Sequence, residues 1–136
     1  MIPKGPLLFD SHALLRFFQK EPGHEEVARL LDHTRRARTK KLLCAINLGE
    51  IIYITKRAFG DQKKIEVLAH IERLGFIVVP VPNNIVFQAA EFKAEYSISF
   101  ADCFALATAL DQMASIVTGD PEFRKVEHLT KVVWIG

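Results

Sequence analysis

The sequence alternates short apolar runs with longer segments of helical periodicity, and this alternation restricts the fold more than any other feature. Strands are predicted at 7–9, 42–46, 76–81, 115–119 and 131–135, and helices at 12–18, 24–36, 47–59, 62–74, 84–96 and 99–113. Strands joined through helices pair in parallel with right-handed crossovers. The pattern therefore predicts an α/β fold, a three-layer sandwich with a central, mainly parallel sheet flanked by helices. At 136 residues the chain is the size of one domain, which we expect to cover 1–136.

Several segments carry more specific expectations. "FIVVPV" (76–81) is continuously apolar and rich in β-branched residues, which predicts a strand covered on both faces. "SFADCFALATALDQM" (99–113) is apolar nearly all the way round, which predicts a buried helix. Asn47 is expected to cap the helix that follows the strand at 42–46, and Gly75 is expected to end the helix at 62–74.

Composition narrows the class of protein. Hydrophobic residues make up 49% of the chain and charged residues 25%, the balance of a soluble globular protein. No apolar run reaches the length of a membrane span, and "MIPKGPLLFD" lacks the features of a secretion signal, so we expect a cytoplasmic protein without a membrane partner. Cys44 and Cys103 lie in apolar surroundings and are interpreted as reduced core residues.

Four acidic residues stand where a predicted strand ends or a predicted helix begins: Asp10, Glu50, Asp102 and Asp120. Each has a structural explanation. Asp10 and Asp120 can cap the helices that follow them, Asp120 with Pro121 at the first helical position. Glu50 lies three residues after Asn47 and Asp102 three after Ser99, the spacing of a capping box.

Capping does not explain why all four acids would meet at one edge of a parallel sheet. Carboxylates crowded together repel unless protons or a cation neutralise them. An all-oxygen cluster suits Mg²⁺ or Mn²⁺, whereas no cysteine or histidine falls at zinc-ligand spacing. Such an ion can activate water and stabilise charge on a phosphate, so hydrolysis would require no histidine or lysine base.

Four stretches in order resemble the motifs of the PIN-domain nucleases and, within them, the VapC-type toxins of toxin–antitoxin pairs. The resemblance covers nearly the whole chain through "LLFDSHALL", "INLGEIIY", "SFADCFALATAL" and "IVTGDPEF". Any one motif is weak, but four in this order are fairly specific. Gly119 departs from the pattern, because many relatives carry a larger and often polar residue there.

The resemblance implies a function and a site. It implies a PIN-like fold and a Mg²⁺-dependent endoribonuclease that leaves a 5′-phosphate and a 3′-hydroxyl. Asp10, Glu50, Asp102 and Asp120 would be the catalytic residues that hold one or two metal ions, with Ser11, Asn47 and Thr118 as supporting hydrogen-bond partners. It further implies an antitoxin protein as a partner and a homodimer.

A basic run follows the second predicted helix: Arg35, Arg36, Arg38, Lys40 and Lys41. An acidic pocket repels the phosphates of RNA, so cations at its rim are needed, and this run is the leading candidate. A solvated helix end is the equally weighted alternative. His12 is interpreted as a solvent-facing helix residue. For Phe17 and Phe18 two interpretations have equal weight: one of them faces a partner, or both are buried where the helix meets a loop.

Two other classes of protein share this arrangement of strands, helices and acids. A phosphoryl-accepting receiver domain needs an acid pair after its first strand and an accepting aspartate after its middle strand, but here a single Asp10 and Pro82 occupy those places. A non-catalytic PIN-like module that binds RNA or protein is more credible. The intact set of four acids argues against it, because loss of catalysis would relax the demand for unfavourable like charges.

Overall fold

The computed structural model describes residues 2–136 and contains a five-stranded sheet in the order β3-β2-β1-β4-β5, in which every neighbouring pair is parallel. The strands are β1 (Leu7–Phe9), β2 (Lys41–Cys44), β3 (Ile77–Val79), β4 (Ser115–Thr118) and β5 (Val132–Trp134). The central strand β1 pairs through Leu8 with Leu42 of β2 and Ile116 of β4. The carboxyl ends of β1 and β4 therefore lie side by side.

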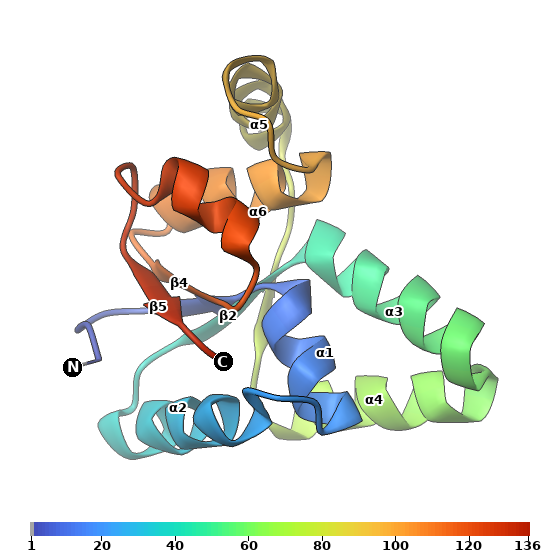
Figure 1. Cartoon of the computed structure of the whole chain (residues 1–136). Helices are drawn as coiled ribbons and strands as arrows, with labels where there is room; N and C mark the ends of the chain where they lie inside the picture. Colours follow the sequence, from blue (N-terminus) through green and yellow to red (C-terminus); the bar gives the residue numbers. More distant parts are fainter. Residues whose placement is uncertain (1) are drawn as a thin grey trace.

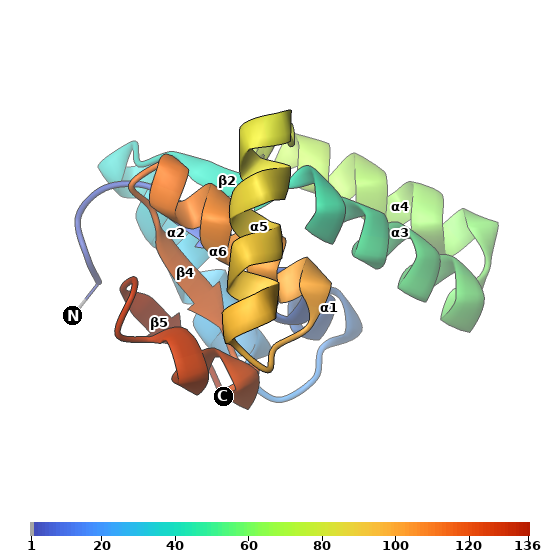
Figure 2. The same cartoon turned by 90° about the horizontal axis from the view of Figure 1, so that it is seen from above.

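Helices cover both faces of the sheet, as Figures 1 and 2 show. They are α1 (Ser11–Gln19), α2 (His24–Ala37), α3 (Ala45–Phe59), α4 (Asp61–Arg73), α5 (Asn83–Glu95), α6 (Phe100–Asp111) and the short 3₁₀ helix η1 (Pro121–Val126). One core packs α5, α6 and η1 against the sheet, and the other packs α1, α2, α4 and part of α3 against the opposite face. The predicted three-layer α/β sandwich is confirmed.

Several local predictions are also confirmed. α2 buries Val27, Leu30, Leu31 and Thr34 on one face, as its periodicity indicates. α6 buries a continuous run from Asp102 to Ala109, and Cys44 and Cys103 are buried free thiols. Gly75 adopts a left-handed conformation (φ 80°) directly after the last turn of α4, where its amide donates to the Glu72 carbonyl.

Two local predictions are wrong. β3 is not covered on both faces, because it lies at the edge of the sheet and leaves Ile77 46% and Val78 40% exposed. Asn47 does not cap α3: the helix begins two residues earlier, at Ala45, after the extended backbone of Cys44. The wholly buried Asn47 side chain is used for contacts within the site described below. No helix within residues 2–136 is both long and apolar enough to cross a membrane.

Candidate active site

Asp10 follows β1 directly and is buried at the carboxyl edge of the sheet. One of its carboxyl oxygens accepts the Ala13 amide at 2.8 Å, the predicted helix cap. The other accepts the hydroxyl of Thr118, which is the last residue of β4. Burial raises the pKa of Asp10 to about 8, Thr118 and Ala13 oppose the rise, and the charges of Asp102 and Asp120 add to it.

Asp120 lies two residues beyond β4, beside Asp10. It caps η1 by accepting the Glu122 amide at 3.0 Å, and its own amide donates to the Thr118 hydroxyl oxygen at 3.0 Å. The Thr118 side chain, wholly buried, thus links Asp10 to the backbone of Asp120. Because β1 and β4 are parallel neighbours, the residues that follow them meet at the same edge.

Glu50 lies on the second turn of α3 and is held from two directions. The Ser11 hydroxyl donates to Glu50 Oε1 at 2.8 Å, and Asn47 Nδ2 donates to the same oxygen at 3.0 Å. The Asn47 amide also reaches the carbonyl of Ala101 on α6 at 3.5 Å, while its Oδ1 is buried without a partner among residues 2–136. These bonds connect the starts of α1, α3 and α6.

Asp102 lies in the first turn of α6, where its backbone amide donates to the Ser99 hydroxyl at 3.1 Å, as the capping-box spacing predicts. Its side chain is only 8% exposed. The pKa of Asp102 is raised to about 6, first by burial and then by the charge of Asp120. The Ser99 hydroxyl opposes the rise, whereas Glu50 and Glu122 add to it.

The structure thus brings the four predicted acids to one edge of the sheet, from β1, α3, α6 and the turn after β4. Asp102 experiences the charges of both Asp120 and Glu50, and Asp10 experiences those of Asp102 and Asp120. Ser11 joins the start of α1 to Glu50. All three supporting residues named from the sequence, Ser11, Asn47 and Thr118, bond within this cluster.

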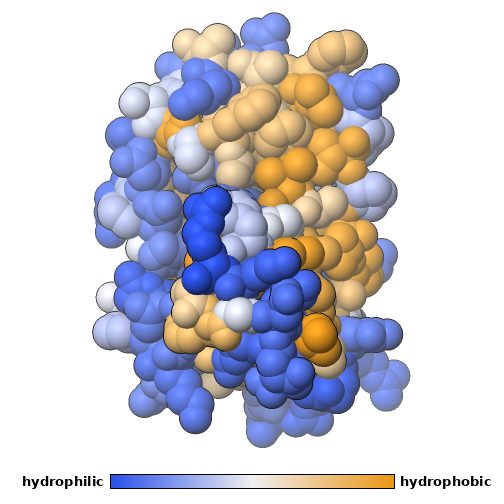
Figure 3. All heavy atoms as spheres, turned by 90° about the vertical axis from the view of Figure 1, so that its right-hand side faces the viewer, coloured by the Kyte–Doolittle hydropathy of each residue, from blue (hydrophilic) through white to orange (hydrophobic). Residues whose placement is uncertain are grey.

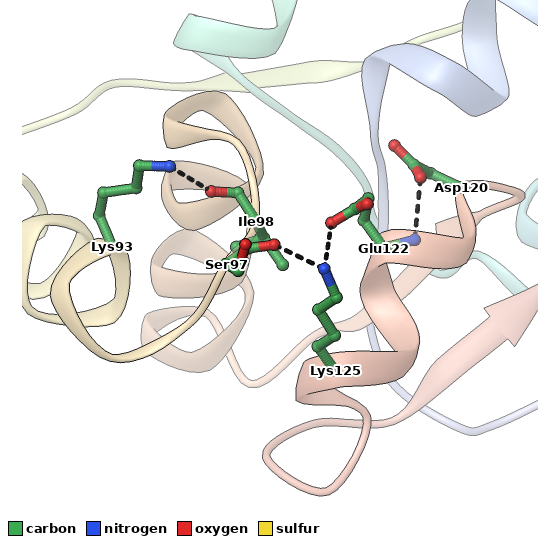
Figure 4. Close-up of polar contacts among 6 residues, drawn as sticks. All are labelled: Lys93, Ser97, Ile98, Asp120, Glu122 and Lys125. Atoms are coloured by element: carbon green, nitrogen blue, oxygen red, sulfur yellow. Dashed lines mark hydrogen bonds and ion pairs between the residues drawn. The ribbon is translucent and has the colours of Figure 1, made fainter.

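Sequence reasoning missed Glu122, whose charge also reaches Asp102. Figure 4 shows Glu122 close to Asp120, with Lys125 extended between Glu122 and the loop before α6. Lys125 Nζ donates to Glu122 Oε2 at 3.0 Å and to the Ser97 carbonyl at 2.8 Å, and Lys93 Nζ donates to the Ile98 carbonyl at 2.8 Å. Only its distance of two residues from Asp120 could have drawn attention to Glu122.

The four acids offer only carboxylate oxygens to a cation. Among residues 2–136 no salt bridge includes any of the four acids, so their charges are left to protons or to an ion. The oxygen chemistry fits Mg²⁺ or Mn²⁺. As the side chains stand, however, no group of three or more His, Cys, Asp or Glu residues in the described chain is arranged to hold a metal ion. Asp10 and Glu50 instead direct oxygens to protein donors.

His12 departs from its predicted role as a solvent-facing residue, because it is half-buried against the turn after β4. A Cβ atom at Gly119 would lie 2.9 Å from His12 Cε1 and 3.0 Å from the Ile135 carbonyl oxygen. The His12 ring therefore takes up space that a larger residue at position 119 would occupy. Burial and Arg16 lower the pKa of His12, while Asp120 and Glu21 oppose this.

The basic run does not border the acids, so the expectation that it lines their rim is wrong. It joins the end of α2 to the start of β2, and Lys41 is in register with Leu7 at the start of β1. Asp10 comes after the last residue of β1. In a parallel sheet all strands begin on one side and end on the opposite side. The basic run therefore lies at the amino-terminal ends of the strands and the acids at their carboxyl ends.

Comparison with known proteins agrees with this architecture. The chain is similar in fold to a chain of VapBC2 from Rickettsia felis, solved bound to a DNA fragment from their promoter, with a TM-score of 0.80, 14% identity, and 96% of this chain and 99% of that chain covered. VapC20 of Mycobacterium tuberculosis, a Sarcin-Ricin loop cleaving toxin, gives a TM-score of 0.71 at 18% identity, with 88% of this chain and 94% of that chain covered. FitAcB of Neisseria gonorrhoeae gives a TM-score of 0.69 at 19% identity, with 93% of this chain and 95% of that chain covered.

A search of curated protein sequences gives no match to this chain. The family model described as the PIN domain matches residues 7–129, from the first residue of β1 to just beyond η1, and the match includes the four acids. That match spans most of the 136 residues. The chain therefore belongs to the PIN domain family.

Proposed function

We propose that this chain is a divalent-metal-dependent endoribonuclease that hydrolyses RNA phosphodiester bonds, and that it is the toxin of a toxin–antitoxin pair. One observation carries the proposal: Asp10 and Asp102 are buried carboxyl groups that both experience the charge of Asp120, Asp10 also experiences that of Asp102, and neither has a cationic partner in the described chain. Such crowding destabilises a fold unless a ligand compensates it.

Asp10, Glu50, Asp102 and Asp120 would hold Mg²⁺ or Mn²⁺. When bound, the ion would lower the pKa of water and compensate charge on the phosphate oxygens. The protein's own part is to orient the oxygens: Thr118 fixes one oxygen of Asp10, and Ser11 with Asn47 fixes Oε1 of Glu50. At neutral pH without a cation the Asp10 carboxyl retains its proton, which cation binding must release.

The decisive experiment is an RNA cleavage assay with and without EDTA. We expect cleavage that requires Mg²⁺ or Mn²⁺ and is abolished in Asp102→Asn. Asp111→Asn is the matched control, because Asp111 is an exposed aspartate on the same helix and should leave cleavage unchanged. Cleavage that persists in EDTA, or that survives in Asp102→Asn, would contradict the proposal.

A second candidate function is a non-catalytic PIN-like module that binds RNA or protein. One observation favours it: within residues 2–136 no three His, Cys, Asp or Glu side chains are already arranged to hold a metal ion together. The two candidates differ in their response to Mg²⁺. A ligand that binds only the native state stabilises it by mass action, so a nuclease should show a thermal shift at millimolar Mg²⁺, whereas a binding module without a metal site should show none.

We further propose an antitoxin partner and a homodimer. One similar structure is described as a toxin–antitoxin complex from Klebsiella pneumoniae, and another as a member of the VapBC family of toxin–antitoxin systems from Mycobacterium tuberculosis. This chain also exposes large apolar side chains, among them Phe59 on α3, Phe87 on α5 and Phe100 on α6. Figure 3 shows apolar side chains gathered over the upper and right-hand parts of one face of the molecule. Light scattering on the purified chain tests the dimer, which should give twice the mass of one chain. Coexpression tests the antitoxin: the protein product of a short neighbouring reading frame should copurify with the chain.

A further inference from the structure

Two acids of the carboxylate site belong to segments that a single lysine joins. Asp120 directly precedes η1, and Asp102 lies in the first turn of α6. Lys125 of η1 donates from Nζ to the Ser97 carbonyl, in the loop before α6, at 2.8 Å and to Glu122 Oε2 at 3.0 Å. Figure 4 shows the Lys125 side chain between η1 and that loop. We call these two bonds the Lys125 bridge.

Both ends of the Lys125 bridge are attached to the acids. On the side of η1, the Glu122 amide donates to Asp120 Oδ1 at 3.0 Å. On the other side, Ser97 lies two residues before Ser99, whose hydroxyl accepts the Asp102 amide at 3.1 Å. A continuous path of hydrogen bonds and short pieces of backbone therefore runs from Asp120 across the bridge to Asp102.

The charges at this place make such a link useful. Asp102 experiences the negative charges of both Asp120 and Glu122, and among residues 2–136 no salt bridge includes Asp102 or Asp120. Repulsion between like charges tends to move η1 away from the start of α6. Lys125 opposes this movement twice, because its ammonium pairs with Glu122 and also bonds the loop before α6.

Two other polar contacts hold the same loop, but neither joins it to η1. Lys93 Nζ donates to the Ile98 carbonyl at 2.8 Å, which ties the loop to α5. The Tyr96 hydroxyl lies 3.3 Å from Nε2 of His128, a residue beyond the end of η1. Along both segments the Lys125 bridge is nearer to the acids than the Tyr96 contact.

We propose that Lys125 is a positioning residue of the carboxylate site, which holds η1 against the loop before α6 and thereby fixes Asp120 relative to Asp102. Lys125 itself touches neither the ion nor the RNA. The role rests on the proposed function, because it serves two acids that would hold one ion. The Lys125 side chain is 47% exposed and acts through backbone. Its loss should therefore cost less than the about ten- to hundredfold in metal affinity that is typical of a direct partner of a metal ligand.

The test compares Mg²⁺ binding by the full chain and by Lys125→Met, measured by isothermal titration calorimetry. Methionine keeps an aliphatic stem and removes the three N–H donors. We expect the Kd for Mg²⁺ to rise about three- to tenfold. The direction of the change is diagnostic. Removing a positive charge near the acids would by itself strengthen the binding of a cation, so weaker binding identifies lost positioning.

Two variants serve as controls. Arg124→Met removes the same charge from the neighbouring position of η1, where Arg124 Cζ lies 4.5 Å from the centre of the Trp134 ring. It should change the Kd less than about twofold. Lys125→Arg retains the charge and can donate to both oxygens, so it should recover most of the affinity. No weakening by Lys125→Met, equal weakening by Arg124→Met, or no recovery by Lys125→Arg would overturn the inference.

Two further readouts separate positioning from other roles. In EDTA, Lys125→Met should speed hydrogen exchange of the Asp102 and Glu122 amides about threefold or more, whereas Arg124→Met should not. In RNA cleavage with Mg²⁺, lost positioning should lower kcat and leave KM within about twofold of the parent. A raised KM with unchanged Mg²⁺ binding would instead identify Lys125 as an RNA contact and overturn the inference.

Failure of this inference and failure of the proposed function give different results. If the parent chain binds Mg²⁺ and cleaves RNA, but neither the Kd nor the amide exchange responds to Lys125→Met, the inference alone is overturned. If the parent chain binds no Mg²⁺ and cleaves no RNA, the proposed nuclease is overturned. Amide exchange in EDTA then still decides whether the Lys125 bridge holds η1 to the loop before α6.

Discussion

Replacing Asp102 by asparagine should stabilise this chain when no divalent cation is present. The Asp102 side chain is 8% exposed and lies among the charges of Asp120, Glu50 and Glu122, and its pKa is raised to about 6. Asparagine has nearly the same shape and carries no charge. The cap of α6 is unaffected, because it uses the Asp102 backbone amide and the Ser99 hydroxyl.

The size of the effect follows from the two pKa values. An unperturbed aspartate has a pKa of 3.8 and Asp102 in the folded chain one of about 6, so folding disfavours the carboxylate form of Asp102 by about 2–3 kcal/mol. Because the folded pKa is the higher one, the cost is absent below about pH 4, grows through about pH 6 and is complete above it. In EDTA at about pH 8 the variant should melt roughly 5–10 °C above the parent.

The assay is thermal unfolding followed by circular dichroism in EDTA at about pH 4.5 and pH 8. The gain of Asp102→Asn should be large at the higher pH and small at the lower one. Asp111→Asn should change stability by no more than about 0.5 kcal/mol at either pH. A lower melting temperature for Asp102→Asn at the higher pH would refute the reasoning and show that the Asp102 carboxylate stabilises the native fold.

Three other predictions concern the same edge of the sheet. Since the pKa of Asp10 is raised to about 8, protons compete with a cation there, so the thermal shift produced by Mg²⁺ should increase as pH rises from about 6 to about 8; a shift independent of pH would place the ion elsewhere. Thr118→Val removes the hydroxyl that donates to Asp10 and accepts the Asp120 amide, so it should cost about 1–3 kcal/mol in urea denaturation, and an unchanged midpoint would mean that these bonds contribute nothing. Gly119→Ala places a methyl group 2.9 Å from His12 Cε1 and should destabilise the chain by about 1–3 kcal/mol in thermal unfolding; a stability equal to that of the parent would mean that the ring moves aside freely.

The sequence alone determined the features that depend on neighbours a few residues away. The caps by Asp10, Ser99 and Asp120 each satisfy amides two or three residues along the chain, so the spacing of the letters predicts them. The buried faces of α2 and α6 follow from residue periodicity in the same way. The alternation of strands and helices predicted the sandwich, and acids at strand ends predicted a shared edge.

The tertiary structure decided what depends on which elements become neighbours. The order β3-β2-β1-β4-β5 places Thr118 against Asp10 and leaves β3 at an exposed edge, although β3 has the composition of a covered strand. The packing of α3 against α6 buries the Asn47 side chain, whose amide donates to the Ala101 carbonyl of α6 and to Glu50 on its own helix instead of capping α3. Strand order and helix packing are chosen by burial summed over the whole chain, so no local window contains that information.

The two groups of charges illustrate the same division. The sequence located both the acids and the basic run, but only the fold placed them at opposite ends of the strands and brought Arg35 and Lys41 to the same cavity as the distant Arg73. Spacing along a chain specifies what a residue does to its own helix or turn. The residues that it meets across the molecule are specified by long-range packing, because a side chain's environment is made by segments far away in the sequence.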